Sequence, residues 1–189
     1  MNILLFMIGC VFTHNIVFDR LLGVGDAGKD RRVEVAAVYG LAVCAVMTLT
    51  AVCAWAADSL LLTPMKLDFL RVPAFTLIAI LISLLGQVCL GKVKPAWLEQ
   101  LEGCALPVAA NVAVLGVALM NAEAGYSFAY ALLNGLCSGV GFLLAVVLMA
   151  GVREKLDFSR IPAPFKGMPI TLISAGLIAL AFIGFKGMA

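Results

Sequence analysis

The sequence contains few charged residues. Asp, Glu, Lys and Arg account for 13% of its 189 positions, whereas soluble domains carry roughly 25%. Hydrophobic residues account for 63%. Such a chain has too little charge to cover a water-facing surface, so the composition excludes a soluble enzyme and a disordered chain. It indicates an integral membrane protein that crosses the bilayer several times.

Several functional signatures are also missing. There is no polybasic segment and the net charge is only +2, so nothing predicts binding to nucleic acid. No phosphate-binding glycine loop and no nucleophile with a neighbouring base can be found, so the sequence predicts no catalytic residues. The six cysteines contain no Cys-x-x-Cys pair and no zinc or ferredoxin spacing. All lie in or beside apolar stretches, where small buried thiols are common; they are Cys10, Cys44, Cys53, Cys89, Cys104 and Cys137.

Six apolar runs are long enough, at about 20 residues each, to cross a bilayer as helices. Charged residues lie between the runs or at their edges, apart from Glu34, which is one residue inside a boundary. His14 is the one ionisable side chain well inside a run, and such residues commonly mark transport pathways. The pattern predicts an all-α integral membrane protein with six transmembrane helices. The runs cover residues 2–18, 33–57, 72–91, 103–122, 126–150 and 168–185.

Basic residues are distributed unevenly between the loops. Ten Lys and Arg residues follow the first, third and fifth runs. Three lie on the other side, at Lys66, Arg71 and Lys186. Because loops rich in Lys and Arg stay in the cytoplasm, the sequence predicts a multi-pass protein with both termini outside.

Two connecting segments repeat each other. Residues 66–75 read Lys-Leu-Asp-Phe-Leu-Arg-Val-Pro-Ala-Phe, and residues 155–165 read Lys-Leu-Asp-Phe-Ser-Arg-Ile-Pro-Ala-Pro-Phe. Each copy precedes the third run of its half, and three runs separate the copies, so the copies lie on opposite membrane faces. The sequence predicts a single membrane domain, residues 1–189, built as a 3+3 inverted-topology repeat of residues 1–95 and 96–189. Chance similarity between two amphipathic connectors is the alternative.

Small residues at four-residue spacing predict a close-packed bundle. Gly135 and Gly139 form a Gly-x-x-x-Gly motif in the fifth run. Ala36 and Gly40 occupy the matching place in the second run. Such pairs let helix backbones approach closely in a membrane. A weaker echo between Tyr39-Gly40-Leu41 and Asn134-Gly135-Leu136 agrees with the repeat.

Polar residues interrupt the first and fourth runs. His14 and Asn15 lie in the first run, and Asn111 and Asn121 lie in the fourth, with Asn15 and Asn111 at matching places. A buried asparagine must be hydrogen-bonded, and backbone groups freed by a helix break need such partners. We therefore expect spans 1 and 4 to be broken, with His14, Asn15, Asn111 and Asn121 as candidates for an ion or electron path. The alternatives are hydrogen bonds between helices for Asn15 and Asn111, and a neutral packing residue for His14.

Several segments resemble a known family. Residues 111–121 read Asn-Val-Ala-Val-Leu-Gly-Val-Ala-Leu-Met-Asn, residues 162–167 read Pro-Ala-Pro-Phe-Lys-Gly, and residues 173–177 read Ile-Ser-Ala-Gly-Leu. They resemble the family that includes the A subunit of the Rnf (Rsx) electron-transport complex and the E subunit of the Na⁺-translocating NADH:quinone oxidoreductase. The resemblance covers essentially the whole chain and is most specific in its last third.

The resemblance implies a non-catalytic subunit of an ion-translocating oxidoreductase in the inner (cytoplasmic) membrane of a bacterium or archaeon. It implies a core formed with a homologous membrane subunit of opposite orientation, together with flavin and iron–sulfur subunits. Electron transfer between reduced ferredoxin and NAD⁺ is then coupled to Na⁺ or H⁺ translocation. The resemblance also implies a [2Fe–2S] cluster in the membrane, held by two cysteines from each partner.

The sequence departs from the family at the cluster ligands. The positions that match the family's cysteines are Gly25 and Val112, and neither side chain can bind iron. Three explanations are open: the complex lacks the cluster, Cys10 and Cys104 supply thiolates instead, or the partner supplies every ligand. We expect the first. Two other functions are kept as alternatives, namely a scaffold subunit and a transporter of small solutes or ions that has kept the fold.

Overall fold

The computed structural model of the protein is built of helices. It describes residues 3–20, 22, 33–93, 111–159 and 161–185, and this part of the chain contains no strand. The predicted all-α class is therefore confirmed. Within the described residues the α-helices are α1 (Ile3–Ile8), α2 (Ile16–Arg20), α4 (Val33–Ala57), α5 (Arg71–Val93), α8 (Val112–Glu123), α9 (Phe128–Asp157) and α10 (Met168–Ile183). Short π or 3₁₀ helices occupy Gly9–Thr13, Asp58–Leu62, Asp68–Leu70 and Ala163–Phe165.

Three of the six predicted spans are long continuous helical segments. Val33–Leu62, Asp68–Val88 and Phe128–Leu156 contain 30, 21 and 29 residues and are apolar enough to cross a bilayer. The sixth predicted span corresponds to α10, and the first is divided into α1 and α2. The fourth is represented by α8, because residues 94–110 lie outside the described residues. The boundary between the two predicted repeats falls in the same gap, so that division stays a prediction.

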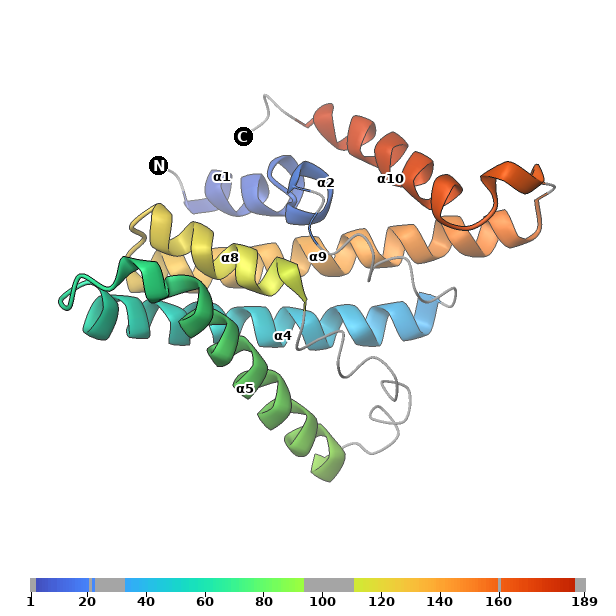
Figure 1. Ribbon diagram of the computed structural model, residues 1–189. Coiled ribbons are helices and arrows are strands. Elements are labelled where there is room, and N and C mark those ends of the chain that lie inside the picture. The colour runs from blue at the N-terminus through green and yellow to red at the C-terminus, as the bar shows by residue number, and fades with distance from the viewer. Residues whose placement is uncertain (1–2, 21, 23–32, 94–110, 160, 186–189) are drawn as a thin grey trace.

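The centre of the molecule is the antiparallel pair of α4 and α9 (Figure 1). The two backbones meet at the small residues that the sequence singled out. A methyl group added at Gly139 would lie 2.9 Å from the Cα of Cys44, and one added at Gly40 would lie 3.1 Å from the Cα of Leu143. Gly135 lies in the same contact, one turn before Gly139. The glycines therefore allow a backbone approach that larger residues would prevent.

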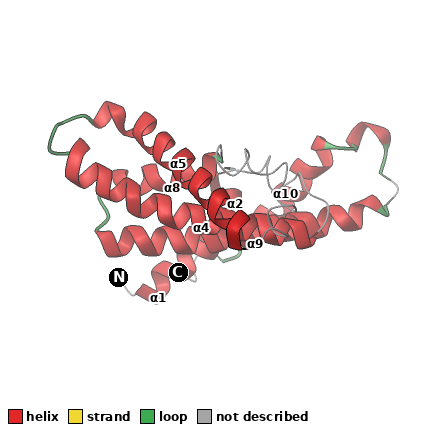
Figure 2. Cartoon of the chain, turned by 90° about the horizontal axis from the view of Figure 1, so that it is seen from below, coloured by secondary structure: helices red, strands yellow, loops and turns green. Residues whose placement is uncertain are grey.

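The remaining helices pack around this pair. α8 lies against α4 and α9, α5 lies against α4 and α8, and α10 lies against α2 and α9. Seen from below, α5 and α8 lie toward one end of the pair and α10 toward the other (Figure 2). Close van der Waals packing holds the short helices α2 and α8 against the centre. The core between α2, α4, α8 and α9 includes Val17, Val43, Val114, Phe142 and Met149.

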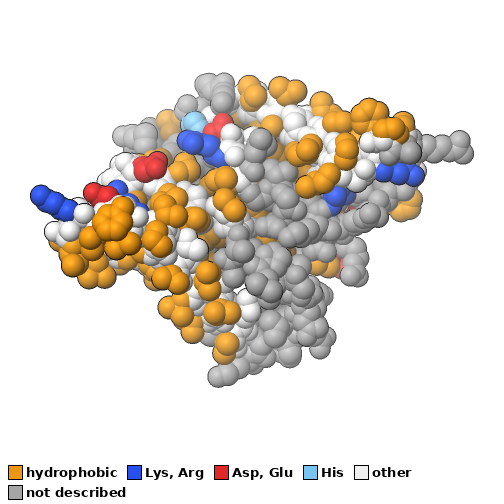
Figure 3. Space-filling model, in the orientation of Figure 1, with side chains coloured by type: hydrophobic (Ala, Val, Ile, Leu, Met, Phe, Trp, Pro, Cys, Tyr) orange, Lys and Arg blue, Asp and Glu red, His pale blue; other side chains and the backbone are white. Residues whose placement is uncertain are grey.

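Much of the described surface is apolar. Leu77 and Leu81 on α5, and Leu177 and Leu180 on α10, are each more than half exposed. Hydrophobic side chains dominate the described part of the face in Figure 3, while Lys, Arg, Asp and Glu gather in a few places. A soluble monomer rarely exposes apolar patches of this extent, whereas lipid or a partner protein covers them in a membrane. The surface is that of an integral membrane protein.

Gly139→Ala is expected to destabilise the α4–α9 contact. The added methyl group would lie 2.6 Å from the Cys44 Sγ and 2.9 Å from the Cys44 Cα, and overpacking of this kind costs about 1–3 kcal/mol. Gly151→Ala is the matched control on the same helix, since nothing lies within 4 Å of its added methyl group. Thermal unfolding in detergent should give a lower Tm for Gly139→Ala alone. Equal Tm values for the two variants would contradict this packing.

Candidate functional site

The first predicted span is interrupted at His14 and Asn15. The chain leaves the π-helix Gly9–Thr13 at His14, whose φ and ψ are −112° and 41°, and α2 begins at Ile16. Asn15 is 1% exposed. Its Oδ1 accepts a hydrogen bond from the Val17 N–H at 3.0 Å. The asparagine therefore supplies an acceptor to one of the backbone donors that the start of α2 leaves without a helical partner.

The amide nitrogen of Asn15 ties the break to its surroundings. Its Nδ2 donates to the Val11 carbonyl at 3.0 Å, on the other side of the break. The same nitrogen donates to the Gly141 carbonyl of α9 at 2.8 Å. Both N–H groups of the amide are used, so Asn15 fixes the geometry of the break and has no donor left for a ligand.

Asn111 performs the same task at the start of α8. Its Oδ1 accepts a hydrogen bond from the Ala113 N–H at 2.8 Å, and its Nδ2 donates to the Tyr39 hydroxyl of α4 at 3.2 Å. The side chain is 3% exposed. α8 thus begins inside the predicted fourth span, with an asparagine as its N-cap. The rest of that span, residues 103–110, lies outside the described residues.

The two asparagines make corresponding contacts. Asn15 bonds to α9, the middle helix of the second half, and Asn111 bonds to α4, the middle helix of the first. This exchange is the pattern that an inverted repeat predicts. It supports the repeat, which stays a prediction. It also shows that the hydrogen bonds between helices that the sequence left as an alternative are present at both positions.

Asn121 belongs to a second buried network, which centres on Asn134. The Asn134 Nδ2 donates to the Asn121 Oδ1 at 2.6 Å, and the Asn121 Nδ2 donates to the Ala131 carbonyl at 3.3 Å. The Asn134 Oδ1 accepts from the Cys10 Sγ at 3.3 Å and from the Ser138 Oγ at 3.4 Å. Asn134 was not a predicted site residue. The sequence signal that could have identified it is the similarity between residues 39–41 and 134–136, in which Asn134 matches Tyr39.

His14 is exposed, not packed. Its side chain is 67% exposed, and its Nδ1 lies 4.0 Å from the Asp19 Oδ2. The Arg20 Nε lies 3.9 Å from the same carboxylate oxygen. Within this chain, the His14 side chain is therefore not packed inside the bundle. The three side chains lie together where the chain turns through the break into α2.

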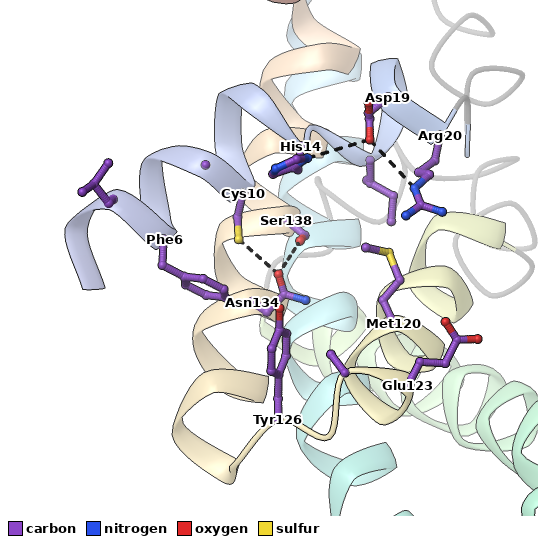
Figure 4. A pocket seen from close by; sticks show the side chains of 14 residues that line it. Phe6, Cys10, His14, Asp19, Arg20, Met120, Glu123, Tyr126, Asn134 and Ser138 are labelled. Atoms are coloured by element: carbon purple, nitrogen blue, oxygen red, sulfur yellow. Dashed lines mark hydrogen bonds and ion pairs between the residues drawn. The ribbon is translucent and has the colours of Figure 1, made fainter. Parts of the chain in front are cut away.

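A cavity of about 690 Å³ lies between the first span and the α8–α9 pair. Figure 4 shows its walls: His14, Asp19 and Arg20 stand at one edge, Glu123 and Tyr126 at the other, and Cys10, Asn134 and Ser138 between them. Leu5, Phe6, Ile16 and Met120 supply apolar walls. His14 and the Asn134 network therefore line the same cavity. Asn15 and Asn111 do not line it.

The described cysteines do not form an iron–sulfur site. Val112 is 56% exposed and carries no ligand atom. Cys10 is buried, with its thiol donating to Asn134. In the described part of the chain, no group of three or more His, Cys, Asp and Glu residues could hold a metal ion. Gly25 and Cys104 lie outside the described residues. The expectation that the cluster is missing therefore stays a prediction.

A divided first helix, an asparagine-capped helix that begins within the bundle, and a tightly packed antiparallel pair at the centre define a class of protein. It is an all-helical membrane protein with helix breaks in its interior, an architecture common among proteins that move ions or solutes. The chain belongs to the family described as "Rnf-Nqr subunit, membrane protein", whose model matches residues 3–189.

Several relatives match this chain over nearly the full length of both sequences. The chain is 43% identical over 189 residues to the A subunit of the ion-translocating oxidoreductase complex of Syntrophotalea carbinolica, a match that covers 99% of this chain and 97% of the relative. It is 42% identical over 187 residues to proteins of the same name from Shigella flexneri serotype 5b and Citrobacter koseri, and each match covers 98% of this chain and 96% of the relative.

Asn15→Leu is expected to lower the stability of the protein. Leucine has a similar volume but leaves the Val17 N–H without its acceptor, and a buried unsatisfied donor costs about 1–3 kcal/mol. Thr50→Val is the control, because the Thr50 hydroxyl is buried and has no hydrogen-bond partner among the described residues. Thermal unfolding in detergent should show a loss for Asn15→Leu and none for Thr50→Val. An unchanged Tm for Asn15→Leu would mean that the break does not depend on this amide.

Proposed function

We propose that this protein is an A-type membrane subunit of an Rnf-type complex that couples electron transfer to the translocation of Na⁺ or H⁺. The similarity to proteins named as the A subunit of an ion-translocating oxidoreductase complex, over nearly the whole of both chains, carries this proposal. The subunit itself is non-catalytic. Hydride and flavin chemistry belong to other subunits, between reduced ferredoxin as donor and NAD⁺ as acceptor.

The same proposal includes a partner and an orientation. The subunit forms a core with a homologous membrane subunit of opposite orientation, joined by flavin and iron–sulfur subunits. The exposed apolar surface, which includes Val112 at the start of α8, supports contact with lipid or a partner. The excess of Lys and Arg in the loops after the first, third and fifth spans supports an inner-membrane protein with both termini outside.

We further propose that this chain contributes no ligand to an iron–sulfur cluster. Gly25 and Val112 stand where the family resemblance requires thiolates. The Cys10 thiol donates a hydrogen bond to the Asn134 amide oxygen, which gives it a structural role. The structural role of the subunit does not need the cluster, because asparagine amides, not metal, satisfy the backbone at Asn15 and Asn111.

The proposed function is tested by purifying the tagged chain from its native membranes. Flavin-containing subunits should co-purify. The assembly should reduce NAD⁺ with reduced ferredoxin and should load Na⁺ or H⁺ into proteoliposomes as it does so. A chain that purifies alone and moves solute in liposomes would instead favour the transporter alternative. A chain that joins an inactive assembly would favour the scaffold.

The absence of iron ligands gives a separate prediction. Cys10→Ser and Cys104→Ser should leave the iron content and visible absorbance of the purified complex unchanged, because neither thiol holds iron. Cys53→Ser is the control for the loss of a thiol that lies at the surface. The measurement is the amount of iron bound per mole of this chain in each variant. Loss of iron in Cys10→Ser or Cys104→Ser, but not in Cys53→Ser, would show that the chain does hold a cluster.

A further inference from the structure

A cavity of about 280 Å³ lies at the corner where the chain passes from α9 to α10. Figure 1 places this corner at the opposite end of α9 from the turn that joins α8 to α9. Gly167, whose φ is 87°, turns the chain into α10. The cavity is lined from α9 by Arg153 and Leu156, from the connector by Ser159, Ile161 and Lys166, and from α10 by Ile170.

The polar walls of this cavity are basic. Among the described residues that line it, Arg153 and Lys166 carry positive charge and none is acidic. The Arg153 Nη2 donates to the Thr171 Oγ1 of α10 at 2.9 Å. A guanidinium presents five N–H donors in a planar fork, so Arg153 can bond to Thr171 and to a second acceptor at once. With the Ser159 hydroxyl beside them, these groups suit an anion that carries several oxygens, such as a phosphate.

The corresponding corner of the first half is built differently. There the Arg71 Nε lies 2.6 Å from the Asp58 Oδ1, and the Arg71 Nη2 lies 3.1 Å from the Asp68 Oδ1. Two carboxylates therefore compensate the arginine. Asp58 lies eight positions before the first repeated segment, and Val147 lies at the same distance before the second. The α9–α10 corner therefore has no counterpart of the Asp58 carboxylate.

An exposed apolar stripe begins at the cavity and runs along α10. Ile170 lines the cavity, and Ile173, Leu177 and Leu180 follow at spacings of three, four and three, which places all four on one helix face. Leu177 and Leu180 are 63% and 66% exposed. Hydrophobic side chains also gather over α10 on the face shown in Figure 3. The ten residues from Ile170 to Leu180 rise about 15 Å, which is half of a hydrocarbon core of about 30 Å.

The cavity and the stripe together favour a lipid over a free anion. A free phosphate would occupy the basic cavity and leave the apolar stripe uncovered. A zwitterionic lipid would cover the stripe but bring its own cation toward Arg153 and Lys166. An anionic phospholipid matches both, because its headgroup is negative and its acyl chains reach about the depth of one leaflet.

We propose that the α9–α10 corner is a binding site for an anionic phospholipid. Arg153 and Lys166 hold the lipid phosphate in the cavity, and one acyl chain lies along the stripe from Ile173 to Leu180. The lipid thereby ties the start of α10 to the end of α9. The inference does not depend on electron transfer, since it needs only that the chain spans the membrane.

Photocrosslinking in the detergent-solubilised complex tests the site. The probe is phosphatidylglycerol with a diazirine on one acyl chain, used below saturation so that the yield follows affinity, and crosslinked peptides are mapped by mass spectrometry. In the wild type, the probe should label the α10 stripe, and unlabelled phosphatidylglycerol should compete. Lys166→Gln should lower this labelling about tenfold, because a charged hydrogen bond to the phosphate is lost. Lys166 is exposed, so the fold does not depend on its side chain.

Two controls separate a specific site from general attraction to lipid. Lys155→Gln makes the same change of charge on α9 at an exposed residue that does not line the cavity, and it should leave the labelling of α10 unchanged. Leu77 and Leu81 on α5 are also exposed and apolar, and labelling there should not respond to Lys166→Gln. Arg153→Gln should lower the labelling of α10 as Lys166→Gln does.

Four results would overturn the proposal. In the first, α10 of the wild type is not labelled, which would mean that protein covers the stripe. In the second, a phosphatidylcholine probe of the same chain length labels α10 equally well, so that the charge of the headgroup is irrelevant. In the third, Lys155→Gln lowers the labelling as much as Lys166→Gln. In the fourth, inorganic phosphate competes as well as phosphatidylglycerol, so that the occupant is a free anion. None of these results bears on the proposed function, which is judged by electron transfer and ion movement.

Discussion

The close approach of α4 and α9 is the contact on which the rest of the structure depends. Gly40 and Gly139 have no side chain that would hold these helices apart. Gly141 serves the neighbouring helix in the same way, since a methyl group there would lie 3.1 Å from the Asn15 Nδ2. Glycines of α4 and α9 therefore set the spacing of the central pair, and Gly141 of α9 sets the distance at which the broken first span can dock.

A break in a membrane helix is stable only where its freed backbone groups find partners, because the bilayer core offers no water to replace them. Asn15 and Asn111 meet this condition in the same way. In each, the amide oxygen accepts from the new helix start while the amide nitrogen reaches a central helix. One side chain thus satisfies the break and fixes its place. The helices that result are short. The cavity of about 690 Å³ lies between the first span and the α8–α9 pair.

The sequence was informative where a local pattern has one physical meaning. Hydrophobic run length predicted the spans, and asparagine inside an apolar run predicted the interruption at Asn15 and the new start at Asn111. The sequence was less informative about the site. The residues that line the site come from distant helices, and their contacts depend on which faces of those helices meet. Cys10 and Asn134 are 124 positions apart, and their contact is set by helix rotation. The same limit explains His14, whose pairing with Asp19 follows from the turn after the break and not from the apolar run around it.

The asparagine framework also accounts for how this chain can carry Val112, where the family resemblance implies a cysteine, without losing the start of α8. Val112 directly follows the capping residue Asn111, and its side chain points outward while the asparagine points in. A change at the outward position therefore leaves the cap, the bond to Tyr39 and the core residues Ala113 and Val114 untouched. Valine makes this spot apolar, which suits contact with lipid or a partner protein. The residue that caps α8, Asn111, is thus separate from Val112, where the family resemblance implies a cluster ligand. The start of α8 therefore does not depend on the side chain at position 112.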